Sequence, residues 1–359
     1  MTKVALLATA AASAALLLAA TASAQATTAP APSAPAPASP APGQGSPTPV
    51  APVAPGRIQL IVRHAFGKPL FVIAGRRMAV RGVVVPYVAG QKVKVSVYRE
   101  GRKVDVQTVS VLAARNGTGK FELSYSSAGA GLVQARAVHY ATPEQALFTG
   151  RSISIRVAGT NLSGGAQGFS VRVLQSELNA LHYAVPLSGV FDEATGHAVI
   201  AYRKVTGLER VPSTNVRVFE LLQRGAGSFH VRYRRDGRHV EADLTRQVLA
   251  EIEPGGRVRA IYTMSSGKPS TPTVIGHFLV YSKTPGVNSE GMVDSNYFIR
   301  GYAIHGYPEV PTFAASHGCL RVPIPDAASI FGWVQMGTPV DVYNEGGGGS
   351  SHVNGNAGP

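Results

Sequence analysis

The fold is decided by the stretch AIHGYPEVPTFAASHGCLRVP, residues 303–323, which contains Cys319, the only cysteine of this 359-residue chain. His305 ends a run, YFIRGYAIHG, that we expect to be one strand. Cys319 is expected on a loop that precedes a short helix beginning near Pro325. Strand ends and loops held on a rigid frame commonly carry catalytic groups. The stretch therefore predicts a mainly β domain with the thiol on a loop and a short helix after it.

One interpretation of these residues is nucleophilic catalysis. A free thiol has a pKa of about 8.5 and needs a base or a cation nearby. His305 can take the proton of Cys319 and hold the thiolate in an ion pair. Gly318 permits a tight turn, and the N–H groups of Gly318 and Cys319 could face a developing oxyanion. Arg321 adds a positive charge that suits a substrate carrying carboxylates.

Two alternatives use the same residues. Cys319, His317 and His305 could form a zinc site, although no second cysteine and no HExxH pair accompany them. Cys319 could instead be inert and buried, as free cysteines often are. A Ser-His-Gly string beside an arginine fills a core poorly, because each polar group would need a partner.

The N-terminus has the pattern of a secretory signal over residues 1–24, with Lys3, an apolar run and small residues from Ala22 to Ala24. A membrane anchor is the alternative, but the apolar run is shorter than the ~20 residues that span a bilayer. Residues 25–56 are rich in Pro, Ala and Ser and predict a disordered spacer. We therefore expect a secreted protein of the cell wall or periplasm, whose lone cysteine has no disulfide partner.

The charge balance points to an anionic partner. Lys and Arg number 34 against 20 Asp and Glu, a formal net charge of +14. Such an excess attracts polyanions. Anionic wall polymers fit an exported chain, whereas nucleic acid does not, since no nucleic-acid-binding motif is present.

Residues 57–158 alternate apolar and polar side chains, which predicts several short strands. Glu100 and Gly101 separate two such runs and predict a hairpin. We expect an all-β sandwich of the immunoglobulin-like type that serves as a spacer or adhesion module.

Residues 159–169 form a glycine-rich linker, after which the apolar period becomes helical. Residues 170–224 predict a small helical domain. Asp192 is a candidate helix cap, and NVRVFELLQ at 215–223 predicts a third helix.

Residues 228–343 return to strands, with Pro254-Gly255-Gly256 predicting a hairpin and PDAASIFGWVQM predicting the helix after the cysteine. The tail 344–359 is expected to be flexible.

The helical segment resembles a peptidoglycan-binding domain of the three-helix type. The match lies between Val171 and Leu208 and includes Leu174-Gln175, Tyr183 and Gly189-Val190-Phe191. The chain departs from this family at His182, where glycine is more frequent, and at Tyr202-Arg203, where Phe-Gln is usual.

The segment 228–343 resembles the catalytic domain of the L,D-transpeptidases, the YkuD family, through His-Gly followed by Ser-His-Gly-Cys-Leu-Arg. The resemblance implies that Cys319 is the nucleophile and His305 the proton acceptor and donor. It implies that Ser316, His317, Gly318 and Arg321 shape the pocket. No metal or organic cofactor is implied.

Two departures from this family are visible. Val274 and Ile275 are extra residues before Gly276 in TPTVIGHF, and Ala315 replaces a frequent proline.

The resemblance further implies a substrate and a reaction. A peptidoglycan stem tetrapeptide would acylate Cys319, release D-alanine and pass to a neighbouring stem amine as a 3→3 cross-link. Water as acceptor would make the same site an L,D-carboxypeptidase. Carbapenem β-lactams would acylate it. A different class, a non-catalytic peptidoglycan-binding or adhesion protein, would need a degenerate site.

Overall fold

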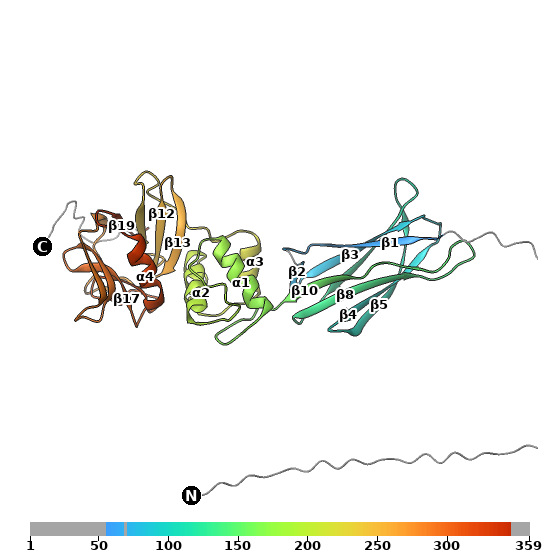
Figure 1. Ribbon diagram of the computed structural model, residues 1–359, viewed down its shortest axis with the longest axis horizontal. Helices are drawn as coiled ribbons and strands as arrows, with labels where there is room; N and C mark the ends of the chain where they lie inside the picture. Colours follow the sequence, from blue (N-terminus) through green and yellow to red (C-terminus); the bar gives the residue numbers. More distant parts are fainter. Residues whose placement is uncertain (1–54, 68–69, 346–359) are drawn as a thin grey trace, which may run out of the picture. The chain divides into compact units, whose positions relative to one another are not determined.

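A computed structural model of the chain describes residues 55–67 and 70–345 (Figure 1). The predicted signal segment 1–24, nearly all of the predicted spacer and all but two residues of the predicted tail lie outside the described residues. Within the described part, no helix has the length and apolar character needed to cross a membrane.

The first folded region is made of strands. They are β1 (Arg57–Arg63), β2 (Phe71–Ile73), β3 (Arg77–Val85), β4 (Lys92–Arg99), β5 (Arg102–Ser110), β6 (Leu112–Ala113), β7 (Gly119–Ser126), β8 (Gly131–His139), β9 (Phe148–Thr149) and β10 (Ile153–Ala158). One sheet has the order β1-β3-β7-β6 and the other β2-β10-β8-β4-β5, with β9 paired to β8. Alternate residues of β4 are buried, as the sequence pattern predicts. The predicted hairpin is confirmed, because Glu100 and Gly101 adopt φ of 47° and 76° between β4 and β5. The immunoglobulin-like type stays a prediction.

The second region contains three helices: α1 (Phe169–Ala180), α2 (Glu193–Val205) and α3 (Val216–Gln223). Asp192 caps α2 as predicted, since its Oδ1 accepts a hydrogen bond from the Thr195 N–H at 2.8 Å. His182 has a φ of 68°, a left-handed conformation that glycine adopts more easily. This conformation explains why glycine is more frequent at this position in the family that the segment resembles, and it does not explain the histidine.

The third region is mainly β. Its elements are β11 (His239–Asp243), β12 (Val248–Glu253), β13 (Arg257–Thr263), β14 (Gly276–Leu279), β15 (Ser282–Val287), β16 (Val293–Ile299), β17 (Tyr302–Tyr307), β18 (Leu320–Pro323), α4 (Ile324–Trp333) and β19 (Pro339–Tyr343). Five strands form one sheet in the order β13-β12-β11-β19-β14, and four form a second in the order β15-β16-β17-β18. Apolar side chains from both sheets and from α4, including Trp333, share one core. The predicted hairpin at Pro254-Gly255-Gly256 is confirmed between β12 and β13.

One prediction near the site is wrong. The run YFIRGYAIHG is not one strand but the hairpin of β16 and β17, because Arg300 turns the chain with a φ of 46°. His305 consequently lies inside β17. Cys319 lies on a loop before the predicted helix α4, and the short strand β18, which was not predicted, connects the two. The cysteine is therefore anchored to a sheet.

The helical region and the third region share a single apolar core, which contains Leu178 and Tyr202 from the helices and Ile261 from β13. At this junction Lys204 of α2 is buried, and its Nζ lies 2.9 Å from the Gln247 carbonyl and 2.8 Å from the Met264 carbonyl. Its Nζ also lies 2.7 Å from Thr263 Oγ1. The junction is thus held by apolar packing and by a satisfied buried amine.

Candidate active site

The site is built on the parallel pair β17 and β18, in which His305 lies opposite Arg321. Side chains alternate between the two faces of a strand. Cys319, two residues before Arg321, therefore projects from the same face as Arg321 and His305. The N–H of Ala303, two residues before His305, hydrogen-bonds Cys319. The fold thus brings together the thiol, the imidazole and the guanidinium that the sequence analysis singled out.

The hydrogen bonding of His305 defines its basic nitrogen. Its Nδ1 lies 2.9 Å from the carbonyl oxygen of Gly306. A carbonyl can only accept, so Nδ1 carries the proton and Nε2 has the free lone pair. Burial, with the charge of Arg321 acting in the same direction, lowers the pKa of His305 to about 4. His305 is therefore a neutral base at physiological pH.

Cys319 is a protonated thiol in the resting site. Burial raises its pKa, while the Ala303 N–H and the positive charge of Arg321 act in the opposite direction. Its Sγ lies 3.7 Å from the Gly301 carbonyl. A preformed thiolate–imidazolium ion pair was one expectation from the sequence. The two pKa directions instead favour a neutral pair that transfers its proton when the sulfur attacks.

Ser316 holds the loop that carries Cys319. Its buried hydroxyl donates to the Cys319 carbonyl at 2.6 Å and accepts from the Gly318 N–H at 3.0 Å. The Ser316 N–H donates to the Ser266 carbonyl at 2.9 Å. The suggestion that the Gly318 N–H faces an oxyanion is therefore wrong for this conformation, because that group is already bonded.

Gly318 is required by its surroundings. It has a φ of 123°, and a Cβ at this position would lie 2.0 Å from the ring of Tyr302. No other residue type fits between this ring and the turn. Gly318 therefore permits the turn, as predicted, and also the close approach of Tyr302.

A second loop supports the first, and sequence reasoning missed its residues. Thr273 Oγ1 donates to the Gly318 carbonyl at 2.8 Å and accepts from the Gly267 N–H at 2.8 Å. Thr271 Oγ1 donates to the Ser316 carbonyl at 3.2 Å. Both threonines belong to the TPTVIGHF stretch. Its two hydroxyl side chains were the sequence feature that could have predicted this supporting role.

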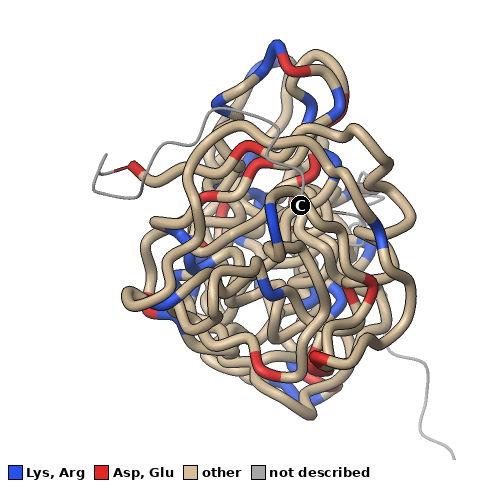
Figure 2. Tube along the Cα trace, turned by 90° about the vertical axis from the view of Figure 1, so that its left-hand side faces the viewer, with Lys and Arg blue, Asp and Glu red and all other residues tan. Residues whose placement is uncertain are grey.

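Positive charges surround the site without acidic partners. Arg321 stacks on the ring of Tyr307, with 4.0 Å from its guanidinium carbon to the ring centroid, and it forms no ion pair with a described carboxylate. His317 is exposed and its Nε2 lies 3.1 Å from Lys268 Nζ. Along the Cα trace in Figure 2, Lys and Arg are interspersed with Asp and Glu. The unpaired cations provide a place for a carboxylate.

The proposed zinc trio of Cys319, His317 and His305 does not converge. Among the described residues, ligand atoms of three or more such side chains come together only at Asp236, His277 and Asp341. The geometry therefore favours the nucleophile interpretation of Cys319.

Comparison with known proteins agrees with this geometry. Residues 237–342 match the model of the L,D-transpeptidase catalytic domain, YkuD. The chain is similar to an L,D-transpeptidase structure (residues 123–326) from Xylanimonas cellulosilytica, with 31% identity over 52% of this chain and 98% of that one and a TM-score of 0.49. No curated protein matches the chain.

Two further structures share the similarity at 27% identity. One is a Cys-to-Ser mutant of an Enterococcus faecium L,D-transpeptidase, which aligns over 30% of this chain and 50% of that one with a TM-score of 0.27. The other is an avibactam carbamoyl enzyme, which aligns over 33% of this chain and 51% of that one with a TM-score of 0.27. Through residues 237–342, which hold both His305 and Cys319, the chain belongs to the L,D-transpeptidase family.

Proposed function

We propose that the chain is a secreted cell-wall enzyme that forms 3→3 peptidoglycan cross-links through a thioester on Cys319. The observation that carries this proposal is the shared face of β17 and β18, where His305, with its Nδ1 bonded to Gly306, leaves Nε2 free beside the thiol position. A positioned neutral base next to a thiol is the arrangement that acyl transfer needs.

The first half-reaction follows from these protonation states. Cys319 Sγ attacks the carbonyl that precedes the terminal D-alanine of a stem tetrapeptide while His305 Nε2 takes the thiol proton. The tetrahedral intermediate collapses, the carbon–nitrogen bond breaks, and His305 returns the proton to the departing D-alanine amine. A thioester remains on Cys319. The carboxylate of the substrate is placed near Arg321, whose charge has no acidic partner in the described residues.

The second half-reaction uses the same groups in reverse. A side-chain amine of a neighbouring stem attacks the thioester carbonyl and gives a proton to His305. The carbon–sulfur bond breaks, and the Cys319 sulfur recovers the proton. Water in place of the amine would give the L,D-carboxypeptidase reaction. A non-catalytic binding role is disfavoured, because the thiol, its base and the loop that holds them are intact.

The other regions are assigned supporting roles. The helical region 170–224 is proposed to bind peptidoglycan, which raises the local concentration of stem peptides. The net charge of +14 suits anionic wall polymers. Carbapenems are proposed as acylating inhibitors of Cys319.

Mass spectrometry of the full chain incubated with a disaccharide tetrapeptide tests the proposal. We expect a covalent adduct on Cys319 with release of one D-alanine per chain. Cys319→Ala should show neither signal, and a carbapenem should give an adduct on the same residue. Adduct formation that persists in Cys319→Ala, or no adduct with either reagent, would contradict the proposed chemistry.

A further inference from the structure

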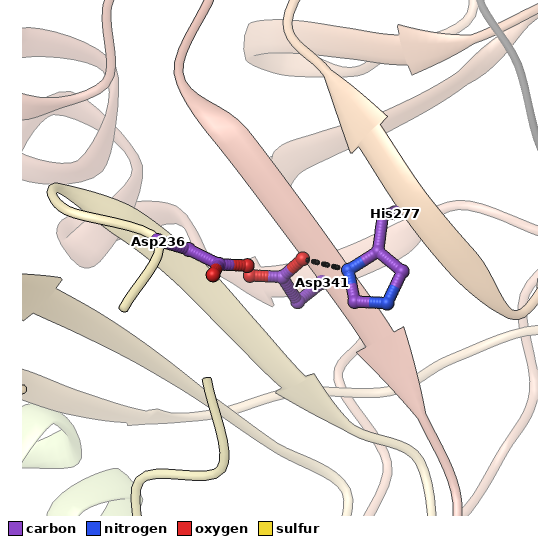
Figure 3. Close-up of side chains that lie close together, drawn as sticks. All are labelled: Asp236, His277 and Asp341. Carbon is purple, nitrogen blue, oxygen red and sulfur yellow. Dashed lines mark hydrogen bonds and ion pairs between the residues drawn. The ribbon is translucent and has the colours of Figure 1, made fainter. Parts of the chain in front are cut away.

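A second cluster of ionisable side chains lies in the five-stranded sheet, away from the strands that carry Cys319. Asp341 on β19 lies opposite His277 on β14, and Asp236 precedes β11. The ligand atoms of the three side chains lie within 4.8 Å of one another. Figure 3 shows Asp341 between the other two, with one carboxylate oxygen toward His277 and the other toward Asp236.

Asp341 has one buried oxygen without a partner. Asp341 is 1% exposed, and its Oδ1 accepts a hydrogen bond from His277 Nδ1 at 2.6 Å. Its Oδ2 is buried and has no hydrogen-bond partner among the described residues. The side chain that faces this oxygen is Asp236, another carboxylate. Two carboxylates that face each other need a cation or a shared proton between them.

The neighbouring strand shows that this sheet can satisfy a buried carboxylate. Glu241 on β11 lies directly opposite Asp341, and it is fully buried. Its carboxylate accepts from the N–H groups of Arg232 and Tyr233, from the Tyr343 hydroxyl at 3.2 Å and from His239 Nε2 at 3.2 Å. The orphan oxygen of Asp341 is therefore a local feature rather than a property of the sheet.

We propose that Asp236, His277 and Asp341 bind a divalent metal ion of the zinc class. An imidazole nitrogen and carboxylate oxygens are ligands of Zn²⁺, and three protein ligands leave a coordination position for water. Ca²⁺ and Mg²⁺ prefer sites made only of oxygen, so the imidazole disfavours them. The ion takes the position of the proton on His277 Nδ1, the imidazole carries that proton on Nε2 instead, and the ion supplies the partner that Asp341 Oδ2 lacks.

A metal ion bound at this site would link segments that are distant in sequence. Asp236 lies in the segment that enters the catalytic domain from the helical region, whereas β14 and β19 form one edge of the sheet. A metal ion bound to the folded chain alone raises its stability by mass action. The inference is independent of the cross-linking proposal, since none of the three residues belongs to the thiol site.

Isothermal titration calorimetry of the full chain with ZnCl₂ at pH 7 tests the inference. We expect one saturable site and a higher melting temperature with zinc. Asp236→Asn removes an exposed ligand without changing its shape and should weaken binding at least tenfold. Glu290→Gln, an exposed carboxylate outside the cluster, is the matched control and should bind as the parent chain does.

A Cys319→Ala chain separates this site from the thiol, which could bind zinc itself. Retention of the single zinc site in Cys319→Ala supports the proposed metal site, and loss of zinc binding in that variant overturns it. Binding that Asp236→Asn leaves unchanged also overturns the proposal, as does equal affinity for CaCl₂. Absence of saturable zinc binding would mean that Asp236 and Asp341 share a proton instead.

Discussion

Buried polar side chains are fully hydrogen-bonded in the loop around Cys319 but only partly in the cluster around Asp341, although both regions belong to the catalytic domain. In the loop, Ser316 and Thr273 each make two hydrogen bonds with their hydroxyls, and these bonds hold the backbone on both sides of the thiol. In the cluster, a buried oxygen of Asp341 faces a second carboxylate without a partner.

The difference indicates what each region is prepared to do. A fully bonded network keeps one geometry, which suits a nucleophile that must meet its substrate at a fixed angle. A buried carboxylate oxygen without a hydrogen-bond partner can still bind a cation. The four predictions that follow test the site and the cluster, beginning with the largest expected effect.

Replacement of the base should have the largest effect. His305→Gln removes the lone pair that accepts the Cys319 proton, and burial has already raised the pKa of that thiol. We expect acylation by a disaccharide tetrapeptide to slow by about 10²–10⁴-fold, as D-alanine release in the first turnover would show. His64→Gln, an exposed histidine in the β-sandwich, is the control. Acylation within threefold of the parent rate would exclude His305 as the base.

The same variant has a signature in stability. Because burial lowers the pKa of His305 to about 4, the unfolded chain takes up this proton below about pH 6.5 while the folded chain does not. Stability should therefore fall as the pH falls from about 6.5 to 4, and His305→Gln should remove that part of the slope. Urea denaturation at pH 7, 5 and 4 measures the difference.

Removal of one loop hydroxyl should have an intermediate effect. Thr273→Val leaves the Gly318 carbonyl and the Gly267 N–H without their partner, at a cost of about 1–3 kcal/mol in the free energy of unfolding. Acylation should slow as well, because the loop loses its geometry. Thr108→Val, at an exposed position of β5, should change neither quantity. Unchanged acylation in Thr273→Val would show that the loop is held by other contacts.

The smallest effect is expected at Asp341, and a matched pair of variants makes it visible. Without added metal, Asp341→Asn should change the free energy of unfolding by no more than about 0.5 kcal/mol, because the new amide can donate to Asp236. Glu241→Gln should cost about 1–3 kcal/mol, because an amide N–H₂ would face the N–H groups that Glu241 now accepts. Equal losses in urea denaturation would remove the contrast between the two carboxylates.

Local signals predicted much of the fold. Glu100-Gly101 and Pro254-Gly255-Gly256 lie at hairpins because their backbones can adopt positive φ, and Asp192 caps a helix through its own side chain. The turn at Arg300-Gly301 was missed, although a charged residue before glycine is the same signal that predicted the hairpin at Glu100-Gly101.

The sequence predicted the candidate catalytic residues but not the hydrogen bonds that position them. Cys319 and His305 follow from the motif and from the chemistry of a lone thiol. Thr273 does not, because its two partners lie 45 and 6 residues away and only the folded chain brings them together. Asp341 and His277 escaped for the same reason, since strand register places them opposite each other across 64 residues.

The common core of the helical region and the catalytic domain has a consequence for where the enzyme can work. Lys204 and the apolar side chains around it join α2 to the catalytic domain through one core, so we expect the two regions to move as one body. If the helices bind peptidoglycan as proposed, the bound strand would be presented to Cys319 in one orientation.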